Sequence, residues 1–152
     1  MAAVGLARWE RIVALREKAE RELAAEISRY RQVNRAMQRF KKIIGKQLVR
    51  ARLLEVDRTV SAIDPVPLDE ALLKVEQEAH LMRDAGRNCN TAFQAFERAQ
   101  DIINSPYISR HDNEQIIREL VEAERNCDMA VRAVQTFLWT QHDQGPAESR
   151  AP

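Results

Sequence analysis

The sequence predicts an all-α protein, an up-down-up three-helix antiparallel bundle with an unusually long first helix. Only 4 Gly and 5 Pro occur in 152 residues, so few positions oppose helix formation. Three of the Pro lie at two expected turns, Pro65 with Pro67 and then Pro106, and the other two lie near the C-terminus. Between these turns, apolar residues recur about every 3.6 positions, which is the repeat of an α-helix.

We expect one helical domain over residues 1–143, with helices at about 6–60, 68–104 and 112–141. A chain of 152 residues with 45% hydrophobic content can bury a single core. The final segment, 144–152, is polar and contains Gly and Pro. Such a composition predicts a disordered tail.

The first predicted helix, 6–60, contains no Pro and one Gly, Gly45. The mean apolar spacing of about 3.6, and not 3.5, favours a straight helix packed in a bundle over a supercoiled one. Whether the helix continues through Gly45 stays open. The apolar positions are Ile12, Leu15, Ala19, Leu23, Ile27, Tyr30, Val33, Met37, Phe40, Ile44 and Leu48.

Two proline-containing segments separate the remaining helices. Pro65 and Pro67 disfavour helical dihedrals in the residues before them and lack a backbone donor. The second predicted helix then runs from about 68 to 104, and the third begins near Asp112, which stands at capping-box spacing from Gln115. Because the connections are short, neighbouring helices are expected to be antiparallel.

The three predicted helices differ in length, so residues 6–24 are expected to extend beyond the other two as an N-terminal arm. An exposed apolar face of this length indicates docking to a protein partner or to a second copy of the protein. The alternative is that the helix breaks, or the hairpin is offset, so that the arm is covered. The candidate partner-binding residues are Leu6, Trp9, Ile12, Leu15 and Leu23.

Positive charge is concentrated between residues 27 and 52, which carry nine basic residues and no acid in a protein of formal net charge +1. Six of them repeat at helical spacing, opposite the apolar positions of the same helix. We call this row the basic face. Its members are Arg31, Arg35, Arg39, Lys42, Lys46 and Arg50.

Three interpretations of the basic face stay open. It is a solvated surface whose cations pair with acids of the other helices, a row of phosphate-binding groups, or a contact for an acidic protein or an anionic membrane surface. Tyr30 and Phe40 lie on the apolar side, so no aromatic platform for bases accompanies the charge. Any nucleic-acid binding is therefore expected to be independent of sequence.

Cys89 and Cys127 follow the same Arg-Asn dipeptide and fall at one level of the predicted hairpin formed by the second and third helices. Our main interpretation is that two small buried residues let the helices approach closely. A disulfide between them is the alternative.

The sequence offers no constellation that predicts catalysis or a metal site. His80, His111 and His142 lie in different segments, and no Glu-x-x-His motif occurs. We therefore expect no enzyme activity, no metal and no cofactor.

No signal-peptide core or membrane-spanning segment is recognised, which predicts a cytoplasmic or other intracellular soluble compartment. The expected function is that of a non-catalytic adaptor or assembly subunit that binds a polyanion or acidic partner through the basic face. The alternative is a purely structural scaffold subunit of a larger complex, with no nucleic-acid role.

Overall fold

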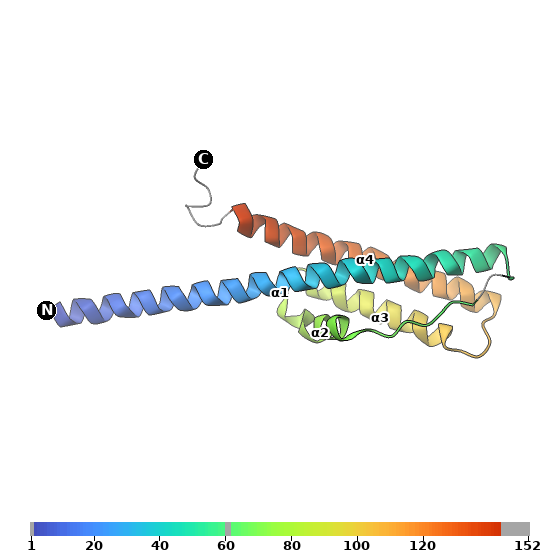
Figure 1. Ribbon diagram of the computed structural model, residues 1–152, viewed down its shortest axis with the longest axis horizontal. Coiled ribbons are helices and arrows are strands. Elements are labelled where there is room, and N and C mark those ends of the chain that lie inside the picture. The colour runs from blue at the N-terminus through green and yellow to red at the C-terminus, as the bar shows by residue number, and fades with distance from the viewer. Residues whose placement is uncertain (1, 60–61, 144–152) are drawn as a thin grey trace.

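The computed structural model describes residues 2–59 and 62–143, and helices account for its regular structure throughout these ranges (Figure 1). The predicted all-α class is confirmed. Four α-helices occur in the described ranges where three were predicted, because the segment expected to form one helix over 68–104 is divided. The elements are α1 (Ala2–Val56), α2 (Glu70–Glu78), the 3₁₀ helix η1 (Ala79–Leu81), α3 (Gly86–Ile103) and α4 (Arg110–Asp143).

Helix α1 is continuous through Gly45, which answers the question that the sequence left open. Its 55 residues give it a length of about 80 Å. It ends at Val56 and not near residue 60, because the backbone turns at the next residue. There the Asp57 carboxylate accepts hydrogen bonds from the backbone N–H and the hydroxyl of Thr59, at 2.9 and 2.6 Å.

An extended linker and α2 run back along α1. Asp69 caps α2 by accepting a hydrogen bond from the Leu72 N–H at 3.0 Å, and it also contacts Arg39 of α1. Farther along α2, Lys74 donates to Gln32 at 3.4 Å, nearer the start of α1. Helix α2 is therefore antiparallel to α1.

Helix α3 runs parallel to α1, so the predicted antiparallel pairing of 6–60 with all of 68–104 is wrong for this part. Phe40 packs edge to face on Phe93 and Phe96, whereas Gln47, farther along α1, contacts Gln100, farther along α3. The backbone reverses between α2 and α3 at η1 and residues 82–85 (Figure 1).

Gly86 is the residue that makes this reversal compact. A Cβ at this position would collide with the carbonyl oxygen of Ala79, so the start of α3 lies against η1 only because residue 86 is glycine. The Gly86 N–H donates to the Met82 carbonyl at 3.2 Å, and Met82 is buried. The division of the predicted second helix follows from this close backbone contact.

Helices α3 and α4 form an antiparallel hairpin, with Arg98 paired to Glu119 at 2.8 Å. Helix α4 begins two residues earlier than predicted, and its cap differs from the predicted pairing of Asp112 with Gln115. The Ser109 N–H donates to Asp112 at 2.9 Å and the Asp112 N–H donates to the Ser109 hydroxyl at 3.1 Å, which is a reciprocal capping pair. Hydrogen bonding from Ser109 to the Asp112 carboxylate lowers the pKa of that carboxyl.

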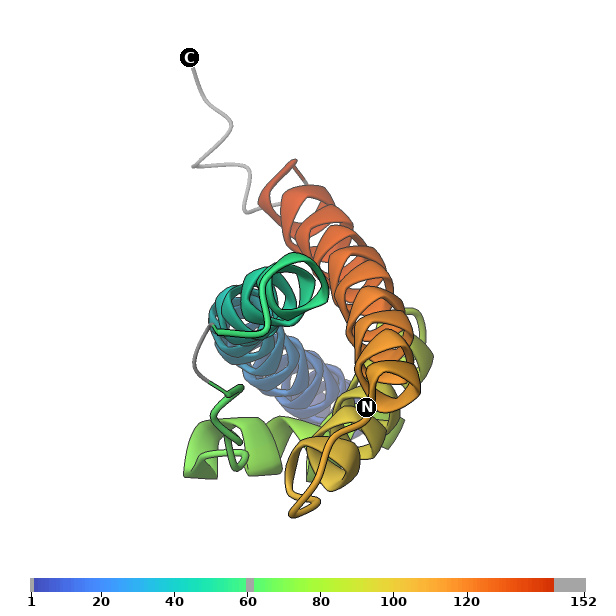
Figure 2. The ribbon, with the colours of Figure 1, turned by 90° about the vertical axis from the view of Figure 1, so that its right-hand side faces the viewer.

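The core lies between α1, α3 and α4, with α2 and the linker closing one side (Figure 2). Its centre is the aromatic contact of Phe40 with Phe93 and Phe96, at ring-centroid distances of 4.9 and 4.8 Å. Toward the N-terminal end of the bundle, Tyr30 stacks on Phe137 of α4 at 3.9 Å. These contacts fix the orientation of α1, and with it the direction of the arm and the basic face.

Two buried amides attach the linker to the helices. The Gln47 and Gln100 side chains donate to each other's carbonyl oxygens, at 2.9 and 2.7 Å. Gln47 also donates to the Asp64 carbonyl, and Gln100 accepts from the Val66 N–H, both at 2.9 Å. Polar backbone of the linker is thereby paired where it packs on α1 and α3.

Candidate binding surfaces

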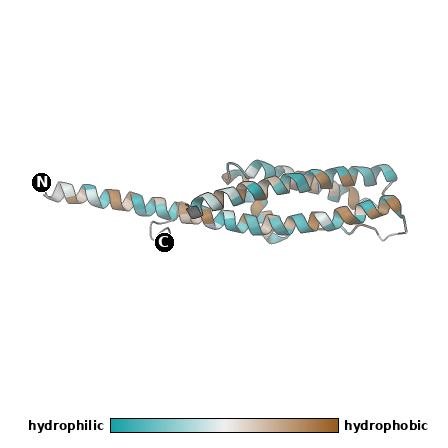
Figure 3. Cartoon of the chain, turned by 90° about the horizontal axis from the view of Figure 1, so that it is seen from above, coloured by the Kyte–Doolittle hydropathy of each residue, from teal (hydrophilic) through white to brown (hydrophobic). Residues whose placement is uncertain are grey.

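The N-terminal arm lies beyond the bundle. Because the Tyr30–Phe137 contact and the hydrogen bond from Asn113 to Ala51 show that α4 is antiparallel to α1, α4 ends at Asp143 near Leu23. Earlier residues of α1 project past it, as Figures 1 and 3 show. At about 1.5 Å per residue, the arm over residues 6–24 is roughly 28 Å long.

The apolar residues predicted on the arm are exposed in this arrangement. Trp9 and Leu15 are 61% and 62% exposed, and Leu23, at the base, is 41% exposed. Leu6 and Ile12 are exposed in the same way. Ile12, Leu15 and Leu23 continue the α1 face that is buried from Tyr30 onward, whereas Trp9 and Leu6 lie about 60° and 120° beyond Ile12 around the helix. The arm therefore presents a core-type helix face with no described element packed on it.

All six residues of the basic face have exposed side chains. Arg39 is already engaged, since its guanidinium contacts both carboxylate oxygens of Asp69, at 2.7 and 2.8 Å. This contact joins the basic face to the N-terminus of α2. The interpretation as intramolecular ion pairs is therefore correct for this residue, even though the face lies opposite the core.

Four other cations of the basic face form no ion pair with any residue in the described ranges. They occur as two pairs on α1, each with i,i+4 spacing, on either side of Arg39. An acid of α4 forms an ion pair with a basic residue that lies next to the basic face. Asp128 contacts Lys41 at 2.6 Å, and this contact raises the pKa of the Lys41 ammonium. The four cations are Arg31, Arg35, Lys42 and Lys46.

Cys89 and Cys127 are both buried free thiols, so the structure contains no disulfide between them. The Cys127 thiol donates to the Met37 carbonyl at 3.1 Å, which places it against α1. Burial raises the pKa of each thiol to about 12. Neither group is positioned as a thiolate nucleophile.

A carboxyl pair joins α2 to α3. Burial, together with Glu76 and Asp101, raises the pKa of the Glu97 carboxyl. Oxygen Oε2 of Glu76 is buried and accepts no hydrogen bond from a described residue. The described ranges hold no cluster of three or more His, Cys, Asp or Glu side chains arranged for a metal ion.

The sequence reasoning missed four buried polar residues of the described ranges, Gln47, Gln100, Asn113 and Asn126. Gln100 lies next to Ala99 on α3, and Gln47 lies next to Leu48 on α1, so each stands at the border of an apolar stripe. Polar residues at such borders are usually solvated, and only the path of the linker shows that these two are paired.

None of the helices in the described ranges is both long and apolar enough to cross a bilayer. Comparison of the sequence with protein-family models, with curated proteins and with solved structures gave no match.

Proposed function

We propose that this protein is a non-catalytic adaptor or assembly subunit, which docks through its N-terminal arm and binds a polyanion through its basic face. The observation that supports this most directly is the uncovered apolar stripe of α1. A helix whose apolar residues Trp9 and Leu15 are more than 60% exposed is typical of one that packs on a partner.

The charges of the arm favour a partner with a mixed charge pattern. Residues 1–26 carry five basic and five acidic residues, interleaved along the helix. A second copy of the arm has the same pattern, and an antiparallel pair centred on residue 19 places unlike charges opposite each other at positions 16 and 22, 17 and 21, and 18 and 20. Self-association through the arm is therefore the simplest form of the docking proposal.

Substitution of apolar arm residues tests this docking. A W9Q/I12Q/L15Q variant keeps good helix formers while removing the stripe. A matched V49Q/L53Q/V56Q variant alters three exposed apolar residues elsewhere on α1. In sedimentation velocity, we expect the wild type and the matched variant to be oligomeric and the arm variant to be monomeric. A wild-type monomer at about 100 µM, well above the dissociation constant of a stable dimer, would refute self-association.

The basic face supports the polyanion part of the proposal because four of its cations have no described ion partner. Arg31, Arg35, Lys42 and Lys46 provide charges every one to two turns, without groups that read bases. If three or four of them contact phosphates, affinity should fall roughly fifty- to a hundredfold between 50 and 200 mM salt.

Charge reversal separates this function from the purely structural alternative. We would change the four unpaired cations to Glu and keep Arg39, whose ion pair with Asp69 supports the fold. A matched variant reverses four exposed cations of other elements, Arg83, Arg87, Arg118 and Arg132. Fluorescence anisotropy with a mixed-sequence DNA should show binding lost only in the first variant. If both variants retain wild-type affinity at low salt, the polyanion function is refuted and the structural scaffold is favoured.

A further inference from the structure

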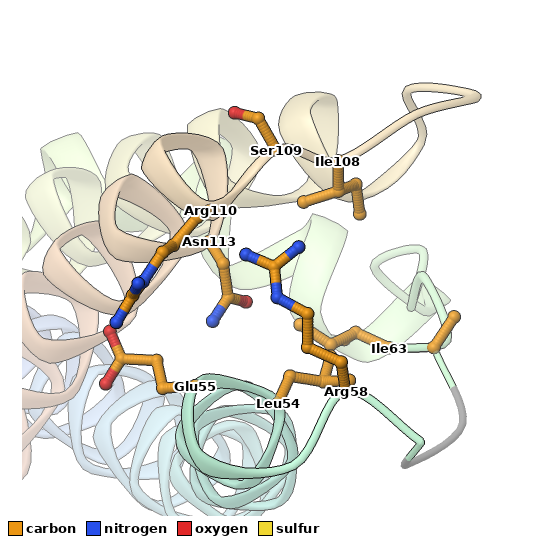
Figure 4. Close-up of a pocket in the computed structure, with 9 residues that line it drawn as sticks. Leu54, Glu55, Arg58, Ile63, Ile108, Ser109, Arg110 and Asn113 are labelled. Atoms are coloured by element: carbon orange, nitrogen blue, oxygen red, sulfur yellow. The ribbon is translucent and has the colours of Figure 1, made fainter.

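A cavity of about 240 Å³ lies at the end of the bundle opposite the arm (Figure 4). The end of α1, the linker and the segment before α4 surround it. Its walls are partly apolar, from Leu54, Ile63 and Ile108, and partly charged, from Glu55, Arg58 and Arg110. This combination of apolar walls and a few polar groups is typical of a small-molecule site.

One polar atom beside this cavity has no hydrogen-bond partner among the described residues. Asn113 is only 7% exposed, and its amide nitrogen donates to the Ala51 carbonyl at 2.9 Å. Its carbonyl oxygen is buried and accepts no hydrogen bond from a described residue. Figure 4 shows this oxygen turned toward the side of the cavity where Arg58 lies. A buried acceptor without a donor is unfavourable, so an occupant that donates a hydrogen bond stabilises this arrangement. Because the oxygen has almost no accessible surface, neighbouring side chains must shift to admit the donor.

The charges around Asn113 specify the rest of the ligand. Arg58 and Arg110 lie on either side of Asn113 in Figure 4, and Glu55 lies below Arg110. Two guanidinium groups and one carboxylate leave a net charge of +1, which suits a monoanion better than a dianionic phosphate. A planar carboxylate also matches the donor geometry of arginine.

We propose that this cavity binds a small carboxylate that carries an adjacent N–H donor and an apolar side chain, the chemistry of an N-acylated amino acid. Arg58 and Arg110 bind the carboxylate, and the Asn113 carbonyl oxygen accepts the ligand N–H. Leu54, Ile63 and Ile108 contact the apolar side chain. The site is distinct from the arm and from the basic face, and it goes beyond the proposed function.

Three related probes test the proposal without altering Asn113, whose substitution could unfold the protein. N-acetyl-leucine has all three features, N-acetyl-leucinamide lacks the charge, and 4-methylpentanoate lacks the N–H donor. In titrations of the full-length protein followed by two-dimensional NMR, we expect saturable shifts with N-acetyl-leucine, at a dissociation constant on the order of 1 mM. Each incomplete probe should bind at least about tenfold more weakly, since it leaves one polar group unpaired.

An R110Q variant adds a test from the side of the protein, with R118Q on the same helix as the matched control. R110Q should weaken N-acetyl-leucine binding about tenfold, whereas R118Q should leave it unchanged. The proposal is overturned if N-acetyl-leucine gives no saturable shifts, if the three probes bind alike, or if R110Q binds as the wild type does. A peptide ending in leucine, titrated in parallel, shows whether the site accepts the C-terminus of a peptide as well as the free acid.

Discussion

Replacement of Gln100 by Leu tests whether the buried amide pair holds the linker to the bundle. The change removes three hydrogen bonds, two with Gln47 and one from the Val66 N–H. It leaves the Gln47 carbonyl oxygen and the Val66 N–H without partners. Each unpaired group costs about 1–3 kcal/mol, and burial of the leucine side chain offsets part of this, so we expect the free energy of unfolding to fall by about 2–4 kcal/mol.

Urea unfolding followed by circular dichroism measures this change, as a lower midpoint at an unchanged slope. Q94L, at an exposed position of the same helix, is the matched control and should remain within about 0.5 kcal/mol of the wild type. The Q47L/Q100L double variant should lose less stability than the two single changes added together, because each single change leaves a partner amide unpaired. A Q100L protein as stable as the Q94L control would show that the amide pair does not stabilise the fold.

Three further predictions concern local contacts. G86A should lower the free energy of unfolding by about 1–3 kcal/mol, because the added Cβ meets the Ala79 carbonyl. G45A has open space around the added Cβ and should raise the free energy of unfolding by about 0.5–1 kcal/mol. Equal effects of the two changes in urea unfolding would contradict this account. Glu97 has a pKa raised above its ordinary value of 4.5, so the folded state holds this proton more tightly than the unfolded state. The stabilisation from the protonated Glu97 carboxyl should be complete below pH 4.5 and should be lost as pH rises through the pKa of the folded state. E97Q should flatten this part of the curve of unfolding free energy against pH, and an unchanged curve would refute this assignment. Both thiols, with pKa values of about 12, should react with iodoacetamide at pH 8 far more slowly in the native protein than in urea, and equal rates by mass spectrometry would show that they are not buried.

The helices themselves could be predicted because their signal is local. The long apolar repeat of α1 and the Pro residues around 65 and 106 set the main elements to within a few residues. Gly86 was visible in the sequence as well, but at a position that also fits the apolar stripe of a continuous helix. Its role depends on contact with Ala79, seven residues earlier, and that contact exists only once the backbone has reversed.

The direction of the helices could not be predicted, because it depends on the linker. A short turn after α1 would have made the next long helix antiparallel to it. Instead, residues 62–69 run back along the bundle, held in part by the amides of Gln47 and Gln100, and α3 is parallel to α1. The candidate sites were less affected, because the exposure of the arm and the basic face depends mainly on α1 being one straight helix.

The ion pair of Arg39 bears on how a polyanion could bind the basic face. It divides the unpaired cations into Arg31 with Arg35 and Lys42 with Lys46, each pair about 6 Å apart along the axis and the two pairs about 10 Å apart. A compact anion reaches one pair only, whereas an extended row of phosphates reaches both. Reversal of either pair alone should therefore reduce the salt dependence of nucleic-acid binding by about half. If one pair carried all of that dependence, the partner would be a localised anionic group and not an extended backbone.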